Sequence, residues 1–249
     1  MSGHSKWSTI KHKKAALDAR RGKAWSKLGR AVTMAAKLGG NPNDNPRLRL
    51  AIEKAKADNM PKDTIEKAIK KGTGELAGES YEEILYEGYG PGGVAVMAKV
   101  VTDNRNRTAG EIRKIFERSG GNLGAAGCVS FQFSSKGVII VSADKASEDR
   151  IMEIALEAGA DDVSSSELIH DVRCSPTSFD KVKRDLDLAG IETESADLSM
   201  VAASEIKLDL ASARKVMKLI DALEEHDDVE AVYTNSDIPD DVVAQLAKE

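Results

Sequence analysis

The apolar pattern of this 249-residue chain changes its period near Tyr81. Before that residue, apolar positions recur every three or four residues, which is typical of helices that pack on one another. After it, runs of strand-forming residues alternate with helical segments. The change predicts a small helical domain followed by an α+β region, and the length is enough for two or three domains.

Three helices are predicted before the change in pattern. The first spans about 13–38, where two glycines stop it. The second begins at Asn45, with Pro46 at its first helical position, and the third spans about 61–72. Together they predict a basic helical domain over residues 1–76 that begins with a flexible arm.

Two ferredoxin-like domains are predicted after the change in pattern. The predicted strands are 82–87, 94–102, 128–134, 137–142, 167–173, 194–202 and 229–235. The predicted helices are 107–119, 145–158, 177–189, 209–226 and 239–247. The order β-α-β-α-β within 137–203, with room for one more strand near Val163, is typical of a ferredoxin-like sandwich. The flanking pieces complete a second sandwich. We therefore predict an α+β fold in which domain 136–205 is inserted into a discontinuous domain, 81–135 and 206–249.

Positive charge is concentrated at the start of the chain. Residues 1–74 hold 18 Lys and Arg against 6 Asp and Glu, whereas residues 75–249 hold 18 against 35. The whole chain has a formal net charge of −5. Such asymmetry is typical of a basic segment that meets a polyanion, joined to an acidic body that does not.

The first thirty residues give the strongest signal for a nucleic-acid interface. Lys and Arg neutralise phosphates, and an aromatic ring can stack on an unpaired base. Trp7 has no apolar face around it and is predicted to contact the ligand, whereas Trp25 is predicted to pack in the core. The competing interpretation is a solvated helix surface. The candidate residues are Lys6, Trp7, Lys11, His12, Lys13, Lys14, Arg20, Arg21, Lys23, Lys27 and Arg30.

A second candidate segment, residues 102–108, lies between a predicted strand and a predicted helix. Arg105 and Arg107 beside a helix N-terminus oppose its dipole, which is tolerable where an anion is shared. Either Asn106 or Thr108 is predicted to cap the helix. We predict that both arginines extend the nucleic-acid surface. Pairing with nearby carboxylates is the alternative, and the sequence leaves the role of the glycine-rich loop 120–127 open.

The sequence shows no pattern typical of catalysis or of a cofactor or metal site. Residues 88–93 have the spacing of a dinucleotide-binding fingerprint, but a strand-like run follows them, so we predict a tight turn. The four histidines lack neighbouring ligands for a metal. Cys128 and Cys174 are predicted to be buried free thiols of a reducing compartment. We expect a cytoplasmic protein that is not an enzyme, without a membrane span. A mitochondrial transit peptide is the alternative interpretation of the basic start.

Several motifs of the chain resemble a known family. They include MSGHSKW at 1–7, NMP at 59–61, YEGYGPGG at 86–93, TDNRNRT at 102–108 and the loop and strand over 120–133. These motifs are similar to those of the YebC/PmpR family of transcriptional regulators, which includes the mitochondrial translational activator of cytochrome oxidase subunit I. The resemblance covers the full length. It implies a three-domain α+β protein with an N-terminal helical domain and no enzymatic activity.

Charge and resemblance together leave two function hypotheses. In the first, which we favour, the basic arm and helix bind duplex DNA and the protein regulates transcription. In the second, the same surface lies on ribosomal RNA, and the acidic domains reach a functional centre or a protein partner. No helix-turn-helix recognition helix is predicted, so both hypotheses imply contact with the phosphate backbone. A module for acidic proteins fits the charge but leaves Trp7 unexplained.

Overall fold

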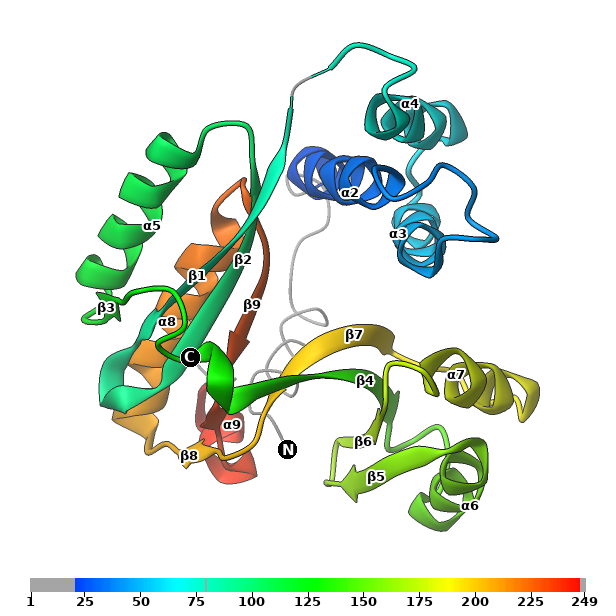
Figure 1. Cartoon of the computed structure of the whole chain (residues 1–249). Helices are drawn as coiled ribbons and strands as arrows, with labels where there is room; N and C mark the ends of the chain where they lie inside the picture. The colour runs from blue at the N-terminus through cyan, green and yellow to red at the C-terminus, as the bar shows by residue number, and fades with distance from the viewer. Residues whose placement is uncertain (1–20, 79, 247–249) are drawn as a thin grey trace.

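Three helices form the first part of the computed structural model, which describes residues 21–78 and 80–246 (Figure 1). They are α2 (Arg21–Ala36), α3 (Pro46–Ala57) and α4 (Lys62–Thr73). Val32, Leu48 and Ile65, one from each helix, meet in a single core. Trp25 packs against this core, as predicted, and its Nε1 donates to the carbonyl of Asp58 at 3.0 Å.

Local sequence explains how these helices begin and how closely they approach. The side chain of Asn45 accepts from the N–H of Leu48 at 3.1 Å and donates to the carbonyl of Ala35 at 2.8 Å, so one residue ties the end of α2 to the start of α3. A Cβ at Gly72 would lie 2.3 Å from the carbonyl oxygen of Thr33. Only glycine allows α4 to approach α2 this closely.

The second part is a four-stranded antiparallel sheet covered by helices on one face. Its strands, in the order β3-β1-β2-β9, are β1 (Glu82–Tyr89), β2 (Ala95–Thr102), β3 (Asn122–Leu123) and β9 (Val229–Thr234). Its helices are α5 (Arg105–Arg118), α8 (Leu210–Glu225) and α9 (Asp240–Leu246). A short parallel pair, β8 (Ile206–Lys207) and β10 (Ser236–Asp237), lies beside them. Phe116, Val96 and Ile220 share the core between sheet and helices.

The third part is a second antiparallel sheet with two helices. Its strands, in the order β5-β6-β4-β7, are β4 (Phe133–Ser142), β5 (Ala160–Ser165), β6 (Ile169–Cys174) and β7 (Ser195–Ala202). Its helices are α6 (Glu148–Ala158) and α7 (Phe179–Leu188). The chain enters through β4 and returns through its neighbour β7. The α+β class and the insertion of one such domain into another are therefore confirmed, whereas the boundaries 1–76, 81–135, 136–205 and 206–249 stay predictions.

One predicted strand, 128–134, is wrong. Residues there form a loop and a 3-10 turn, Ser130–Gln132, and the strand that follows runs unbroken through the predicted gap as β4. The predicted gap, residues 135 and 136, lies inside β4. Gly137 also lies inside the strand, where a Cβ would be 2.6 Å from Cys174 Sγ. The extra strand near Val163 is confirmed as β5.

The predicted turn after β1 is confirmed. A 3-10 turn, Pro91–Gly93, connects β1 to β2, and Gly92 and Gly93 have φ values of 73° and 75°. Only glycine adopts this conformation readily. Cys128 and Cys174 are free thiols, as predicted, but Cys128 is half-buried in a loop rather than buried in a strand.

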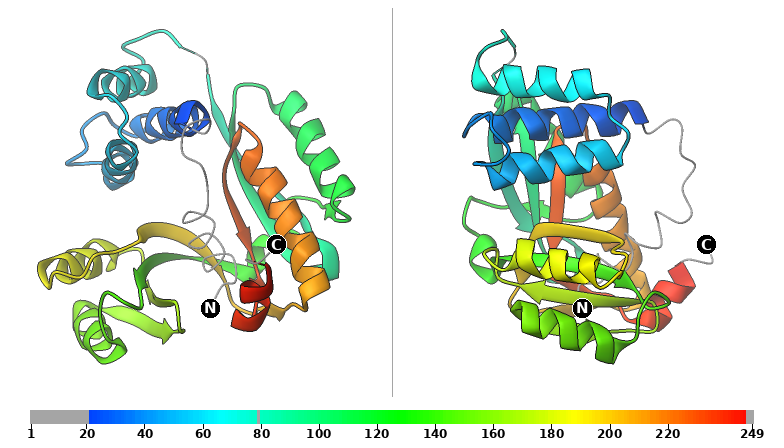
Figure 2. Two further views of the ribbon diagram at one scale, coloured as in Figure 1. Left: turned by 180° about the vertical axis from the view of Figure 1, so that it is seen from behind. Right: turned by 90° about the vertical axis from the view of Figure 1, so that its right-hand side faces the viewer.

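The helical part and the inserted domain lie on the same side of the second domain's sheet, opposite α5 and α8 (Figure 2). Ala95 and Met97 of β2 form a small apolar cluster with Phe133 of β4, which joins the sheets of the two α+β domains. No helix within 21–78 or 80–246 is long and apolar enough to span a bilayer.

Candidate nucleic-acid interface

Most of the predicted arm lies outside the described residues. This group comprises Lys6, Trp7, Lys11, His12, Lys13, Lys14 and Arg20. Arg21 and Lys23 belong to the first turn of α2, and the structure describes side chains from Ala24 onward. Their predicted contact with nucleic acid stays a prediction.

The structure places the next two predicted contacts, Lys27 and Arg30, against the second domain. Lys27 donates to the carbonyl of Glu224 at the end of α8. Arg30 donates to the carbonyl of Asp227, and its Nη1 lies 3.7 Å from the Asp228 carboxylate. The Arg30 side chain is only 17% exposed. Helical spacing correctly separates these cations from the helix core, but another domain covers the face on which they lie.

Asp228 is at the centre of this contact between α2 and the second domain, which we call the joint. Its side chain is 6% exposed and accepts from the hydroxyls of Thr108 at 2.7 Å and Thr102 at 3.1 Å. Arg107 donates to the same carboxylate at 2.7 Å. Burial raises the pKa of Asp228, but the bonds from Thr108, Arg107 and Thr102 outweigh it and hold the pKa below its usual value. The carboxylate is therefore ionised at neutral pH.

The two arginines of the second candidate segment have different surroundings. Arg107 pairs with Asp228 and, at 3.1 Å, with Asp103, so the alternative of carboxylate pairing describes it correctly. Arg105 is exposed, and its side chain forms no hydrogen bond or salt bridge with a described residue. Its predicted contact with nucleic acid remains open. The helix begins earlier than predicted because Asn104, rather than Asn106 or Thr108, caps it by accepting from the N–H of Arg107 at 3.1 Å.

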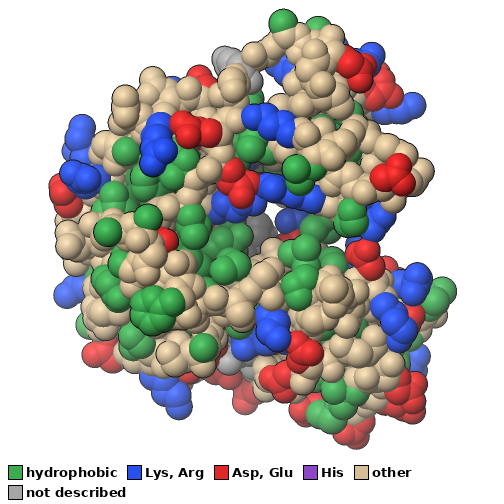
Figure 3. Space-filling model, in the orientation of Figure 1, with side chains coloured by type: hydrophobic (Ala, Val, Ile, Leu, Met, Phe, Trp, Pro, Cys, Tyr) green, Lys and Arg blue, Asp and Glu red, His purple; other side chains and the backbone are tan. Residues whose placement is uncertain are grey.

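The joint opens into a polar cleft of about 530 Å³. Carboxylates of Asp103, Glu111 and Asp227 line it together with Arg30 and Arg107. Figure 3 shows Lys, Arg and acidic side chains gathered where the domains meet. Because charges of both signs alternate within it, this cleft does not fit a polyanion.

Other charged residues of the helical part also contact neighbouring domains. Arg49 pairs with Asp180 of α7 at 2.7 Å, and Glu53 accepts from Lys183 of the same helix at 3.1 Å. Two further pairs, Lys54 with Asp197 and Arg47 with Glu83, complete these contacts. The charges of α3 thus mainly hold the helical part against the two α+β domains.

A group of unpaired cations of the helical part lies on α4. Lys67, Lys70 and Lys71 are exposed, and their side chains form no hydrogen bond or salt bridge with any residue of the described chain. Ile65 and Ala68 face the core, so the three lysines occupy the opposite side of the helix. Sequence reasoning missed this row, although its spacing of three and four residues was a visible signal.

The glycine-rich loop is held by Glu87 of β1. Its carboxylate, in a residue 5% exposed, accepts from the backbone N–H of Gly127, Val129 and Ser130 at 2.8–2.9 Å. Burial raises the pKa of Glu87, but these three bonds outweigh it and lower the net pKa. Phe131, next in the chain, is 77% exposed. The loop therefore presents an aromatic ring on a fixed backbone.

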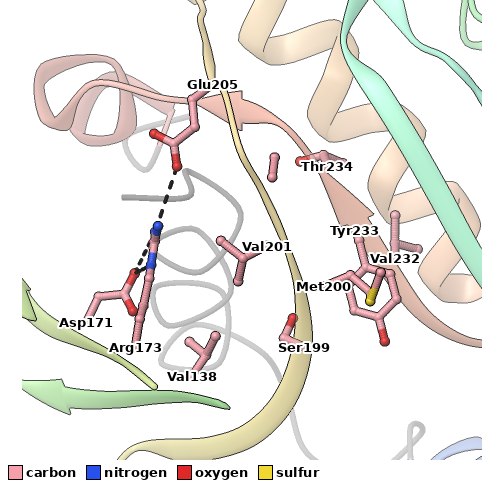
Figure 4. Close-up of a pocket in the computed structure, with 11 residues that line it drawn as sticks. Val138, Asp171, Arg173, Ser199, Met200, Val201, Glu205, Val232, Tyr233 and Thr234 are labelled. Carbon is pink, nitrogen blue, oxygen red and sulfur yellow. Dashed lines mark hydrogen bonds and ion pairs between the residues drawn. The ribbon is translucent and has the colours of Figure 1, made fainter. Parts of the chain in front are cut away.

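A small cavity of about 40 Å³ lies between the two α+β domains (Figure 4). Arg173 bridges Asp171 at 3.1 Å and Glu205 at 3.8 Å along its wall. The cavity has room for little more than a water molecule. Among the described residues, no three His, Cys, Asp or Glu side chains are grouped as a metal would require.

Comparison with known proteins identifies the family. Residues 5–75 match the TACO1/YebC protein N-terminal domain, and residues 81–236 match the TACO1/YebC second and third domain. The chain belongs to the TACO1/YebC family. The predicted resemblance to YebC proteins is confirmed.

Relatives of known name and structure agree with this assignment. A protein of Geobacter sulfurreducens named "Probable transcriptional regulatory protein" is 56% identical over 247 residues, covering 99% of this chain and 100% of the relative. A Treponema pallidum protein of the same name is 54% identical over 244 residues, covering 98% and 100%. The crystal structure of a conserved hypothetical protein from Aquifex aeolicus is 52% identical. It superposes with a TM-score of 0.83, covering 93% of this chain and 96% of that one. The names of the relatives indicate a regulatory role.

Proposed function

We propose that this TACO1/YebC protein regulates transcription by binding duplex DNA through its N-terminal helical domain. The observation that carries the proposal is the distribution of free charge. Residues 1–74 are strongly basic in an acidic chain, and the α4 lysines, Lys67, Lys70 and Lys71, remain unneutralised after the contacts between domains are formed. A polyanion is the ligand that such a surface attracts.

Contact with the phosphate backbone is the expected mode of binding. Lysine is a flexible point charge that contacts phosphates and reads little base identity. The arm, from Lys6 to Arg20, supplies the remaining positive charge in this account. We therefore expect affinity to depend strongly on salt and weakly on sequence.

Neutralising the three exposed lysines of α4 tests the proposal. We expect Lys67→Gln/Lys70→Gln/Lys71→Gln to reduce the slope of log K against log salt by about 3 on duplex DNA, since each phosphate contact contributes about 0.9. Fluorescence anisotropy with a labelled duplex of about 30 base pairs measures it, between about 50 and 200 mM KCl. The control Lys145→Gln/Lys181→Gln/Arg184→Gln removes three charges from the inserted domain. Equal slopes for both triple variants would exclude α4 from the interface.

A second candidate, binding to ribosomal RNA, is favoured by Phe131. An exposed aromatic ring stacks on an unpaired base, a contact worth about 1–3 kcal/mol, and folded RNA offers such bases in loops and bulges. We expect Phe131→Ala or Trp7→Ala to weaken binding to ribosomes about tenfold if RNA is the target. If duplex DNA is the target, both variants should bind a promoter duplex as the wild type does.

A further inference from the structure

The helices α5 and α8 lie side by side and antiparallel on one face of the second domain's sheet. Glu111, in the first half of α5, accepts from His226, the residue after α8, with an Nε2–Oε2 distance of 3.0 Å. Arg107 and Asp228 join the same two ends. The second half of α5 is therefore level with the first half of α8, at the end far from the helical domain (Figures 1 and 2).

Cations dominate this far end of the helical layer. Ile112 and Phe116 of α5 and Val216 of α8 point into the core. Five exposed cations lie on the solvent side of these two helix halves, and we call them the distal cationic surface: Arg113, Lys114, Arg118, Lys215 and Lys218. None of the five side chains forms a hydrogen bond or salt bridge with a residue in 21–78 or 80–246.

Three other charged groups adjoin this surface. Arg214 adds a sixth exposed cation, although it takes part in an interaction of its own. Glu117 is an exposed carboxylate among the cations. Asp209 caps α8 by accepting from the N–H of Ser212 at 2.7 Å, and this bond and the nearby charge of Lys215 lower its pKa. The carboxylates are too few to neutralise the surface.

The positive sign is exceptional in this part of the chain. Segments 112–121 and 209–219 hold six Lys and Arg against two Asp and Glu, whereas the remainder of 75–249 holds 12 against 33. The corresponding layer of the inserted domain, α6 with α7, holds four Lys and Arg against seven Asp and Glu. The same two-helix architecture thus carries opposite charges, so the architecture alone does not explain the cations.

We infer that the distal cationic surface is a second nucleic-acid contact, which binds the phosphate backbone. Figure 3 shows Lys and Arg side chains along the edge of the molecule that α5 occupies. No large hydrophobic side chain of α5 or α8 is exposed, so the surface lacks the apolar residues that insert into a membrane interface. Closely spaced phosphates provide the charge density that several unneutralised cations require.

This surface lies on the other side of the second domain's sheet from the helical domain. One short straight duplex cannot cover both surfaces without bending around the molecule. The protein therefore contacts either two separate segments of nucleic acid or one that wraps around the second domain. The contact is independent of α4.

Neutralising the five cations tests the inference. In the variant Arg113→Gln/Lys114→Gln/Arg118→Gln/Lys215→Gln/Lys218→Gln, the slope of log K against log salt on duplex DNA should fall by about 4. The probes are a labelled duplex and a labelled RNA stem-loop, each of about 30 base pairs, to distinguish DNA from RNA as the source of the phosphates. The matched control is Lys136→Gln/Lys145→Gln/Arg150→Gln/Lys181→Gln/Arg184→Gln, which removes the same charge from the inserted domain and should reduce the slope by less than 1.

Two results would overturn the inference. Equal slopes for variant and control, on both probes, would show that the cations form a solvated surface. Loss of binding to vesicles of phosphatidylserine and phosphatidylcholine, with nucleic-acid slopes unchanged, would reassign the surface to a membrane. If the five-residue variant unfolds at a lower temperature than wild type, Arg113→Gln/Lys114→Gln replaces it, with an expected decrease of about 2.

The outcome is separable from that of the proposed function. Neutralising the arm through Lys11→Gln/Lys13→Gln/Lys14→Gln tests the N-terminal interface in the same assay. If only the arm variant loses salt dependence, the distal contact is refuted and the proposed interface stands. If only the distal variant loses it, the distal contact stands and the proposed interface fails.

Discussion

At the scale of single residues, Asp228 holds the joint between the helical domain and the second domain. Removing its side chain removes the buried acceptor that Thr102, Thr108 and Arg107 share, while Arg107 keeps its contact with Asp103. We expect Asp228→Ala to lower the free energy of unfolding by about 2–3 kcal/mol, limited by the partial exposure of Arg107. Urea denaturation measures this change.

A neighbouring carboxylate provides the control for Asp228. Asp103 also pairs with Arg107, but it lies on the surface. Asp103→Ala should therefore cost about 0–1 kcal/mol. If the two variants lose the same stability, the buried bonds to Asp228 are not what holds the joint.

Glu87 makes stability depend on pH. Its pKa is lower in the folded protein than in the unfolded chain, so its stabilising effect is complete above the unfolded pKa and is lost as pH falls through the folded pKa. We expect the free energy of unfolding to decrease below about pH 4.5, and the decrease to be smaller in Glu87→Gln. Denaturation midpoints between about pH 3 and 6 measure it. The exposed Glu153→Gln, as control, should retain the wild-type pH dependence.

At the scale of helices and strands, the sequence correctly predicted elements that are specified by their own residues. Asn45 and Pro46 mark the start of α3, and the period of apolar residues marks α8. Signals that depend on distant partners were missed. Residues 127–130 do not form a strand because the N–H groups of Gly127, Val129 and Ser130 bond to Glu87, some forty positions away. Likewise, helical spacing gave the face on which Lys27 and Arg30 lie but not the domain that covers it.

Replacing two glycines with alanine should change stability in opposite directions. In β4, a Cβ at Gly137 would lie 2.6 Å from atoms of Cys174 and Phe179, so Gly137→Ala should cost about 1–3 kcal/mol. In α5, a Cβ at Gly110 would meet no atom within 4 Å, and alanine there should stabilise the helix by about 0.5–1 kcal/mol. Thermal unfolding of the two single variants measures both changes. A destabilised Gly110→Ala would contradict the exposed position of that residue.

At the scale of the whole molecule, the domain arrangement determines which positive charges remain available. Arg30 of α2 and Arg49 of α3 pair with the acidic domains, whereas Lys67, Lys70 and Lys71 of α4 remain unpaired within the described chain. Counting charges along the sequence located the basic region. It could not separate paired from unpaired cations, because the ion pairs form only where the domains contact one another.

The salt dependence of duplex binding by the full-length protein tests the central claim most directly. If about six cations of the N-terminal domain contact phosphates, they should contribute about −5 to the slope of log K against log salt, in addition to the contribution of the distal cationic surface. The measurement is anisotropy of a labelled duplex across about 50 to 200 mM KCl. A slope between 0 and about −1 would contradict the claim that the basic domain binds nucleic acid through its charge.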